Sequence, residues 1–155
     1  MQVVFYLNNY TSTDDLVTAV GNIRYGGYPP NLPDALAVAR TSVFATSNGA
    51  RQDSSVLKLA VVFITETMSR YRNATLEEGW AAADMDIGIV TVGIGRMVER
   101  SLLLSITSYP SYKNTFIVQS AVQVIDLAEP IKRIICSGTS VTQSVIYACR
   151  CFTPY

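Results

Sequence analysis

The sequence predicts one α/β domain with three αβα layers and a doubly wound, mostly parallel sheet. Strand-like and helix-like segments alternate three times in succession, the pattern of right-handed crossovers between parallel strands. The stretch Leu57–Thr65 is almost unbroken in its apolar residues, which is typical of a strand covered on both faces. The length of 155 residues, with 49% hydrophobic and 15% charged residues, suits one globular domain with a real core.

The chain is expected to begin with a short strand at Val3–Leu7 and to continue into a helix. Ser12 or Thr13 provides a side-chain cap, and two aspartates follow in the first helical turn. Apolar residues then recur at helical spacing up to about Arg24. The buried stripe expected from that spacing consists of Leu16, Val17, Val20 and Ile23.

A loop and a second helix precede the apolar strand. Residues 25–33 are rich in glycine and proline, so we expect a loop there. Pro33 and Asp34 open the helix, because proline and an acidic residue both suit a first helical turn. The inward residues of this helix are expected to be Leu36, Ala39, Val43 and Phe44. Residues 47–55 form a polar connection to the strand.

The remaining elements alternate in the same way. In chain order, the pattern predicts a helix over 74–83, a strand over 87–94, a helix over 97–106, a turn over 109–112, a strand over 115–118 and a helix over 121–135. Leu76 and Trp80 are expected on the inner face of the first of these helices. The core stripe expected on the last helix consists of Ile125, Ala128, Ile131 and Ile135.

The composition argues against several classes of function. Lys plus Arg and Asp plus Glu both number 12, with no long run of one sign, so neither nucleic acid nor an anionic membrane is an expected partner. There is no histidine, which excludes histidine-based catalytic triads and histidine-ligated zinc. No apolar stretch approaches the roughly 20 residues of a membrane span, and no secretory signal is visible at the N-terminus.

Gly93-Ile94-Gly95 follows a predicted strand and precedes a predicted helix, as the start of a dinucleotide-binding loop would. The position of the third glycine is taken by Val98, and no acidic residue is placed to bind a ribose. We therefore expect ordinary turn glycines. A nucleotide-dependent α/β enzyme is kept only as an alternative, because no phosphate-binding loop is intact.

The cysteines and two sequons bear on the cellular compartment. Three cysteines, Cys136, Cys149 and Cys151, leave at least one without an internal partner, so they are either free thiols or include one whose disulfide partner lies outside this chain. Asn9-Tyr10-Thr11 and Asn73-Ala74-Thr75 match the N-glycosylation pattern and fall in a predicted loop or at a helix start. We expect Asn9 and Asn73 to carry glycans if the chain is secreted.

Glu66 is a single carboxylate at the end of the apolar strand, where ligands bind in open α/β folds. With the hydroxyls of Thr65, Thr67 and Ser69 it makes up half of a site for a hard cation such as Mg²⁺. The alternative is that Glu66 is simply solvated and that Ser69 or Asn73 caps the next helix.

Several phrases resemble a von Willebrand factor type A (VWA) domain of the extracellular-matrix kind. They are Leu7-Asn8-Asn9-Tyr10, Ile23-Arg24-Tyr25-Gly26-Gly27, Asp34-Ala35-Leu36, Val61-Val62-Phe63-Ile64-Thr65, Val90-Thr91-Val92-Gly93-Ile94-Gly95 and Tyr109-Pro110-Ser111-Tyr112 with Phe116-Ile117-Val118. The resemblance runs from about residue 3 to Cys136, so residues 1–136 are expected to be a partial VWA domain and 137–155 an unassigned tail. It implies a Rossmann-like fold that is N-terminally truncated and lacks the family's first two strands and first helix.

Members of this family often hold Mg²⁺ or Mn²⁺ through three loops. The first of these loops is not seen in this chain, the second contains no threonine over residues 26–33, and Glu66 stands in the third where the family has aspartate. The resemblance therefore implies a degenerate metal site and no cofactor. The loops expected to form the ligand face contribute Tyr28, Asn31, Glu66, Thr67 and Ser69.

The resemblance implies a non-enzymatic protein-binding and adhesion module of a secreted, extracellular-matrix glycoprotein. Its expected partners are matrix proteins, including collagen-type ligands, or receptors. The alternative is an intracellular scaffold of the same fold in a multiprotein complex. In matrix-type members a cysteine at the position of Cys136 commonly pairs with one ahead of the first strand, which makes Cys136 the candidate for a disulfide.

Overall fold

The computed structural model describes residues 3–24, 30–53 and 56–137 of the chain. Within these residues the sheet has three parallel strands in the order β1-β2-β3, namely β1 (Lys58–Ile64), β2 (Ile87–Ile94) and β3 (Thr115–Val118). β2 lies in the middle, paired along its length with β1 and over its second half with β3. The three strands predicted from the apolar runs at these positions are confirmed.

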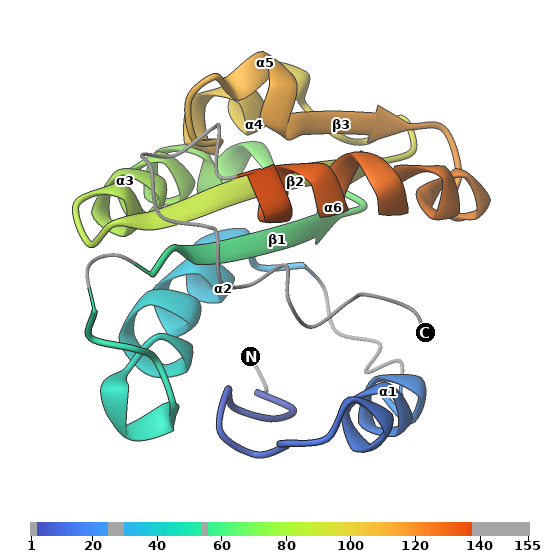
Figure 1. Cartoon of the computed structure of the whole chain (residues 1–155). Helices are drawn as coiled ribbons and strands as arrows, with labels where there is room; N and C mark the ends of the chain where they lie inside the picture. Colours follow the sequence, from blue (N-terminus) through green and yellow to red (C-terminus); the bar gives the residue numbers. More distant parts are fainter. Residues whose placement is uncertain (1–2, 25–29, 54–55, 138–155) are drawn as a thin grey trace.

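Helices connect the consecutive strands. α3 (Arg72–Ala83), preceded by the 3-10 turn η3 (Ser69–Tyr71), joins β1 to β2. α4 (Arg100–Ile106) and α5 (Ser111–Asn114) join β2 to β3. In Figure 1, α3 lies behind the sheet and α6 (Ala128–Ser137) lies in front of it. The αβα layering predicted for parallel strands with helical crossovers is therefore confirmed.

The last predicted helix, over 121–135, is divided into two elements. η4 (Ala121–Leu127) is a 3-10 helix that starts with a capping box between Ser120 and Gln123, and α6 follows directly. Pro130 explains the division, since it lies in the first turn of α6, where the missing N–H costs nothing. In one continuous α-helix the same proline would lie in the interior and remove a hydrogen bond.

Before β1 the chain forms α1 (Thr13–Gly21), α2 (Leu32–Val38), the π-helical turn η1 (Ala39–Val43) and the 3-10 turn η2 (Thr46–Asn48). The predicted Ser12 cap is present, and its hydroxyl accepts a hydrogen bond of 3.4 Å from the Asp15 backbone N–H. α2 lies beneath β1 in Figure 1 and continues without a break into η1.

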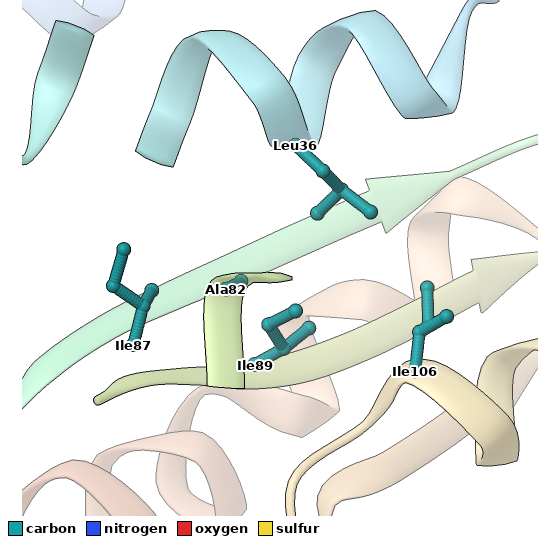
Figure 2. Packing of buried hydrophobic residues seen from close by; sticks show 5 residues of the cluster. All are labelled: Leu36, Ala82, Ile87, Ile89 and Ile106. Carbon is teal, nitrogen blue, oxygen red and sulfur yellow. The ribbon is translucent and has the colours of Figure 1, made fainter. Parts of the chain in front are cut away.

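The hydrophobic core lies between β2 and three helices. Ile87 and Ile89 project from β2, and they meet Leu36 of α2, Ala82 of α3 and Ile106 of α4 (Figure 2). All five are buried, as predicted for Leu36 and for the strand residues. Burying one large apolar side chain is worth about 1.5–3 kcal/mol, so this cluster fixes α2, α3 and α4 on one face of the sheet.

The predicted strand at Val3–Leu7 is wrong, because this segment is irregular. A strand needs a neighbour that pairs with its N–H and C=O groups, and no strand of the described part of the chain pairs with it. The segment is held by side chains instead. The Ser42 hydroxyl donates a 3.3 Å hydrogen bond to the Tyr6 hydroxyl, and Asn8 lies so close to Gly49 that a Cβ there would be 2.7 Å from the Asn8 nitrogen.

The buried stripe predicted on α1 is also wrong. Leu16, Val17, Val20 and Ile23 are all exposed, with Val17 at 64%, and no residue of α1 is buried. The apolar spacing correctly predicts a helix, but burial needs a neighbouring element, and Figure 1 shows α1 apart from the sheet and its covering helices.

The inner face of α3 differs from the prediction. Leu76 packs against the core as expected, whereas Trp80 is 58% exposed. The buried residues of this helix are Thr75, Gly79 and Ala82. A Cβ at Gly79 would lie 2.8 Å from the Ile106 side chain, so small residues let α4 pack closely against α3. The stripe on the last helical region is likewise only partly correct, since Ile131 and Ile135 are half-buried but Ile125 and Ala128 are exposed.

β1 is less covered than its apolar sequence predicts. All of β2 except Ile94 is buried, but in β1 only Ile64 is buried, and Phe63 is 54% exposed. β1 pairs with β2 on one side, and its other edge pairs with no strand of the described residues. An apolar edge strand therefore borders the sheet. No helix within residues 3–24, 30–53 and 56–137 has both the length and the apolar character needed to cross a membrane.

Candidate functional site

Backbone hydrogen bonds join the loops at the carboxyl ends of the three strands. The Thr67 N–H, after β1, donates to the Met97 carbonyl, after β2, at 2.9 Å. The Gly95 N–H donates to the Val118 carbonyl, at the end of β3, at 2.8 Å. Residues 65–72 and 95–101, which we call the carboxyl-edge surface, thus form one connected unit.

The side chain of Thr67 reinforces this connection. Its hydroxyl accepts a 2.8 Å hydrogen bond from the Glu99 backbone N–H and donates to the Met97 carbonyl at 3.4 Å. Thr67 was predicted as a residue of the ligand face, and the structure places it at this edge of the sheet. The Thr67 hydroxyl is thus already engaged within the chain, both as a hydrogen-bond acceptor and as a donor.

Glu66 lies beside Thr67 at the end of β1 and is half-buried. Among the residues that the structure describes, its carboxylate has no hydrogen-bond or ion-pair partner. The predicted helix caps at Ser69 and Asn73 are wrong. The N-cap residue of α3 is Tyr71, without a side-chain cap, while Ser69 begins η3 and Asn73 lies within the first turn of α3.

Glu99 is the second carboxylate of the carboxyl-edge surface, and it is engaged. It forms an ion pair with Arg72 and accepts a 2.6 Å hydrogen bond from the Ser101 hydroxyl. The hydrogen bond from Ser101, followed by the interaction with Arg72, lowers the pKa of the Glu99 carboxyl below its ordinary value. The Glu99 carboxyl therefore loses its proton at a lower pH than an ordinary glutamate, and Arg72 is tied to the loop after β2.

Asn31, also predicted on the ligand face, is the N-cap of α2. Its Oδ1 accepts from the Asp34 N–H at 3.3 Å, and its Nδ2 donates to the Asp34 carboxylate at 2.6 Å. These bonds fix the start of α2 and account for both ends of the amide. Tyr28 lies outside the described residues, so its predicted place on the ligand face is not observed.

The two glycines of Gly93-Ile94-Gly95 have different roles. Gly93 lies within β2, and a Cβ there would be 2.8 Å from Val98, so the loop folds back closely over the strand. Gly95 has a φ of 87°, a left-handed conformation that favours glycine. The expectation of a turn glycine thus holds for Gly95, while Gly93 is required by close packing.

The donor chemistry at the carboxyl-edge surface does not fit a hard divalent cation. Mg²⁺ favours several oxygen ligands including carboxylates, and the described part of the chain has no cluster of three Asp, Glu, Cys or His residues that could hold a metal. Glu66 is available, but the Thr67 hydroxyl is already occupied and Glu99 is paired with Arg72.

The predicted modification sites lie in different surroundings. Asn9 is exposed in an irregular segment, where its Oδ1 accepts from the Tyr6 N–H at 2.5 Å. Asn73 is exposed on α3, but Thr75 of its sequon is buried and donates to the Tyr71 carbonyl at 2.8 Å. Cys136 is half-buried near the end of α6, while Cys149 and Cys151 lie outside the described residues. The glycans and the disulfide remain predictions.

The ion pair between Arg72 and Glu99 was not predicted, because the loop after β1 and the loop after β2 were each interpreted separately. A signal was present in the frequency of arginine, because Arg70 and Arg72 follow β1 closely and Arg96 and Arg100 follow β2 closely. Adjacent parallel strands bring the residues that follow them to the same edge, so the two arginine-rich stretches could have been placed together.

The sequence matches one family model and one related protein over nearly the same length of chain. The model of the family described as von Willebrand factor type A domain matches residues 1–130. The collagen alpha-1(XXI) chain of Homo sapiens is 27% identical over 130 residues, which cover 84% of this chain and 13% of the collagen chain.

Solved structures of proximal thread matrix protein 1 from the mussel byssus are similar in fold. One has a TM-score of 0.70 and covers 81% of this chain, and another, described as having a zinc-occupied MIDAS motif, has a TM-score of 0.76 and covers 87%. Both are 14% identical to this chain, an identity at which the likeness concerns the fold alone. The matched regions are 31% and 33% of the byssus chains, so this chain spans only a part of the length of its relatives.

Proposed function

Because the chain belongs to the von Willebrand factor type A domain family, we propose that residues 1–136 act as a non-enzymatic protein-binding and adhesion module of an extracellular-matrix glycoprotein. Residues 137–155 are then a tail outside that module. VWA domains of matrix proteins generally bind other proteins rather than catalyse reactions, and both named relatives are matrix proteins. The partners proposed for this chain are matrix proteins, including collagens, or receptors.

The observation that carries this proposal is the construction of the carboxyl-edge surface. Backbone bonds from Thr67 to Met97 and from Gly95 to Val118 hold its loops in one geometry. A surface that is already ordered loses little conformational entropy when a partner binds. Met97 is 66% exposed there, which supplies an apolar contact without any rearrangement of the chain.

We also propose that binding does not need a metal ion. The byssus protein has a structure with zinc at its MIDAS motif, but the corresponding loop here offers Glu66 with an occupied Thr67 hydroxyl beside it. Isothermal titration calorimetry with Mg²⁺ or Mn²⁺ should detect no tight binding. Micromolar affinity of the purified chain for either ion would overturn this part of the proposal.

The adhesion function is tested by binding of the full chain to immobilised collagens and matrix extracts, in buffer containing EDTA. Met97→Asp places a charge in the exposed apolar part of the carboxyl-edge surface and should abolish capture. The matched control is Val122→Asp on η4, which changes a side chain that is 81% exposed and lies outside this surface. Equal capture by both variants, or no capture by the unaltered chain, would contradict the proposal.

A further inference from the structure

We infer that the carboxyl-edge surface binds an acidic peptide segment of its partner directly through arginine side chains, in place of a bridging metal ion. This inference rests on the proposed function, because it names the chemistry of the ligand for the same surface. It follows from the balance of charge on the two loops, from the arginines that have no carboxylate partner, and from the apolar side chains between them.

The charge balance of the two loops is positive. Residues 65–72 and 95–101 contain four arginines, Arg70, Arg72, Arg96 and Arg100, and two carboxylates, Glu66 and Glu99. The ion pair of Arg72 with Glu99 removes one charge of each sign. Three guanidinium groups then remain against the single carboxylate of Glu66. Such a surplus opposes the binding of a cation and favours an anionic ligand.

The three remaining arginines are accessible. Arg70, Arg96 and Arg100 are exposed, and none of them forms an ion pair with a carboxylate of the described residues. Arg70 is already oriented, since its guanidinium lies 4.7 Å from the centre of the Tyr71 ring and one of its nitrogens lies 3.4 Å from the Met68 sulfur. A guanidinium held in this way can form two parallel hydrogen bonds to a carboxylate.

The backbone that carries the other two arginines is also fixed. Arg96 lies between Gly95, which is bonded to the end of β3, and Met97, which is bonded to Thr67. Arg100 follows Glu99, whose N–H is bonded to the Thr67 hydroxyl. The side chains of Arg96 and Arg100 keep their rotamer freedom, but the backbone that carries them is fixed on one edge of the sheet. Both guanidinium groups can therefore contact the same ligand.

The apolar content of this surface favours a peptide over a sulfated polysaccharide. Met97 is exposed beside Arg96, and Met68 is half-buried beneath Arg70. These side chains suit a ligand in which carboxylates alternate with apolar groups. A uniformly anionic polysaccharide has no apolar groups to contact the methionines.

The test measures binding of a fluorescently labelled peptide of alternating glutamate and leucine to the full chain, by anisotropy in EDTA. The peptide should bind with unchanged affinity when Mg²⁺ replaces EDTA. A peptide with glutamine in place of glutamate should lose affinity by about tenfold or more. Heparin fragments are the second arm. Heparin binding without binding of the acidic peptide would overturn the inference.

The variant Arg96→Glu/Arg100→Glu should reduce affinity for the acidic peptide by about tenfold or more. Its matched control is Arg51→Glu/Arg133→Glu, which reverses the same number of charges at two exposed arginines outside the carboxyl-edge surface and should bind normally. Equal losses in both variants would show a general effect of net charge and overturn the inference. If capture of matrix proteins is lost in Met97→Asp but retained in Arg96→Glu/Arg100→Glu, the proposed function stands and the inference fails.

Discussion

Phe63 of β1 and Val92 of β2 are direct partners in the parallel sheet, yet Phe63 is 54% exposed while Val92 is fully buried. Side chains of directly paired residues point to the same face of a sheet, so the two side chains would be expected to be buried to a similar extent. The difference arises because β2 has a neighbour on each side, whereas β1 pairs with a described strand on one side only.

The purified chain should therefore self-associate through the edge of β1 in a concentration-dependent way, measured by light scattering after size exclusion. Phe63→Lys should suppress the association, since a charged edge resists pairing. Trp80→Lys, at an exposed aromatic residue of α3, is the control and should leave it unchanged. Fusion of an N-terminal segment that supplies two further strands should also suppress the association, because the added strands would pair with the edge of β1. A monomeric unaltered chain with one sharp unfolding transition would contradict the prediction.

Gly79→Ala, made in the Phe63→Lys background to keep the protein monomeric, should lower the free energy of unfolding by about 1–3 kcal/mol. Alanine favours a helix over glycine by up to about 1 kcal/mol, but its Cβ would lie 2.8 Å from the Ile106 side chain. Gly21→Ala at the end of α1 meets no atom within 4 Å and should be neutral or stabilising. Urea unfolding of the two variants gives the comparison, and equal midpoints would show that α3 and α4 do not pack as described.

Thr67→Ala in the same background should cost about 1 kcal/mol, because the Glu99 N–H loses its acceptor and the hydroxyl donated to Met97 is removed. Thr67→Ser keeps the hydroxyl and should retain most of that free energy. Thr65→Ala, at an exposed residue without a hydrogen bond to the described chain, is the control. The prediction fails if the alanine and serine variants at position 67 unfold at the same urea concentration.

Glu99 should make stability depend on pH in the acid range. Its pKa is lower in the folded chain than its ordinary value of 4.5, so its contribution to stability is present above that value. The contribution is lost as the pH falls through the lowered folded-state value. Since the group is exposed, the effect is small and should diminish in salt. Glu99→Gln should flatten this part of the stability profile, and an unchanged acid limb would refute the assignment.

Expression in secreting eukaryotic cells should glycosylate Asn9 more completely than Asn73. All three residues of the first sequon are exposed in the folded chain, whereas Thr75 of the second is buried and bonded within α3. The second sequon is therefore accessible only before α3 forms. Glycosidase treatment of Asn9→Gln and Asn73→Gln should show the larger mobility change in Asn73→Gln. The opposite order would contradict this.

β1, β2 and β3 were predictable because apolar runs report directly on strands that belong to a sheet, whereas the short apolar segment Val3–Leu7 pairs with no strand of the described residues and is irregular. β2 reads as an apolar run and is buried, and Ser12 caps α1 as its position suggests. Burial of a helix face was less predictable, since it depends on what lies opposite. The exposed side chains of Val17 and Trp80 show that helical spacing identifies the apolar face of a helix but does not determine whether another element packs against that face.

The polar part of the core also escaped prediction. Thr91, Thr107 and Thr115 come from β2, the end of α4 and β3, and their hydroxyls are mutually bonded at 2.7, 3.1 and 3.3 Å in the interior. No single stretch of sequence contains this cluster. The carboxyl-edge surface is a similar case, because Glu66 and Thr67 were identified from one loop, while Glu99 becomes visible only when the second loop is brought beside the first.

The order of strands in space, β1-β2-β3, is the same as their order along the chain. During synthesis β1 emerges first, β2 can then add to it once α3 has formed, and β3 adds to the free side of β2. Each addition closes only the short crossover just completed, which keeps the entropy of loop closure small and favours rapid folding. The sheet can thus extend at the side of β2 where the later part of the chain arrives, while the other side of β1 pairs with no strand of the described residues at any step.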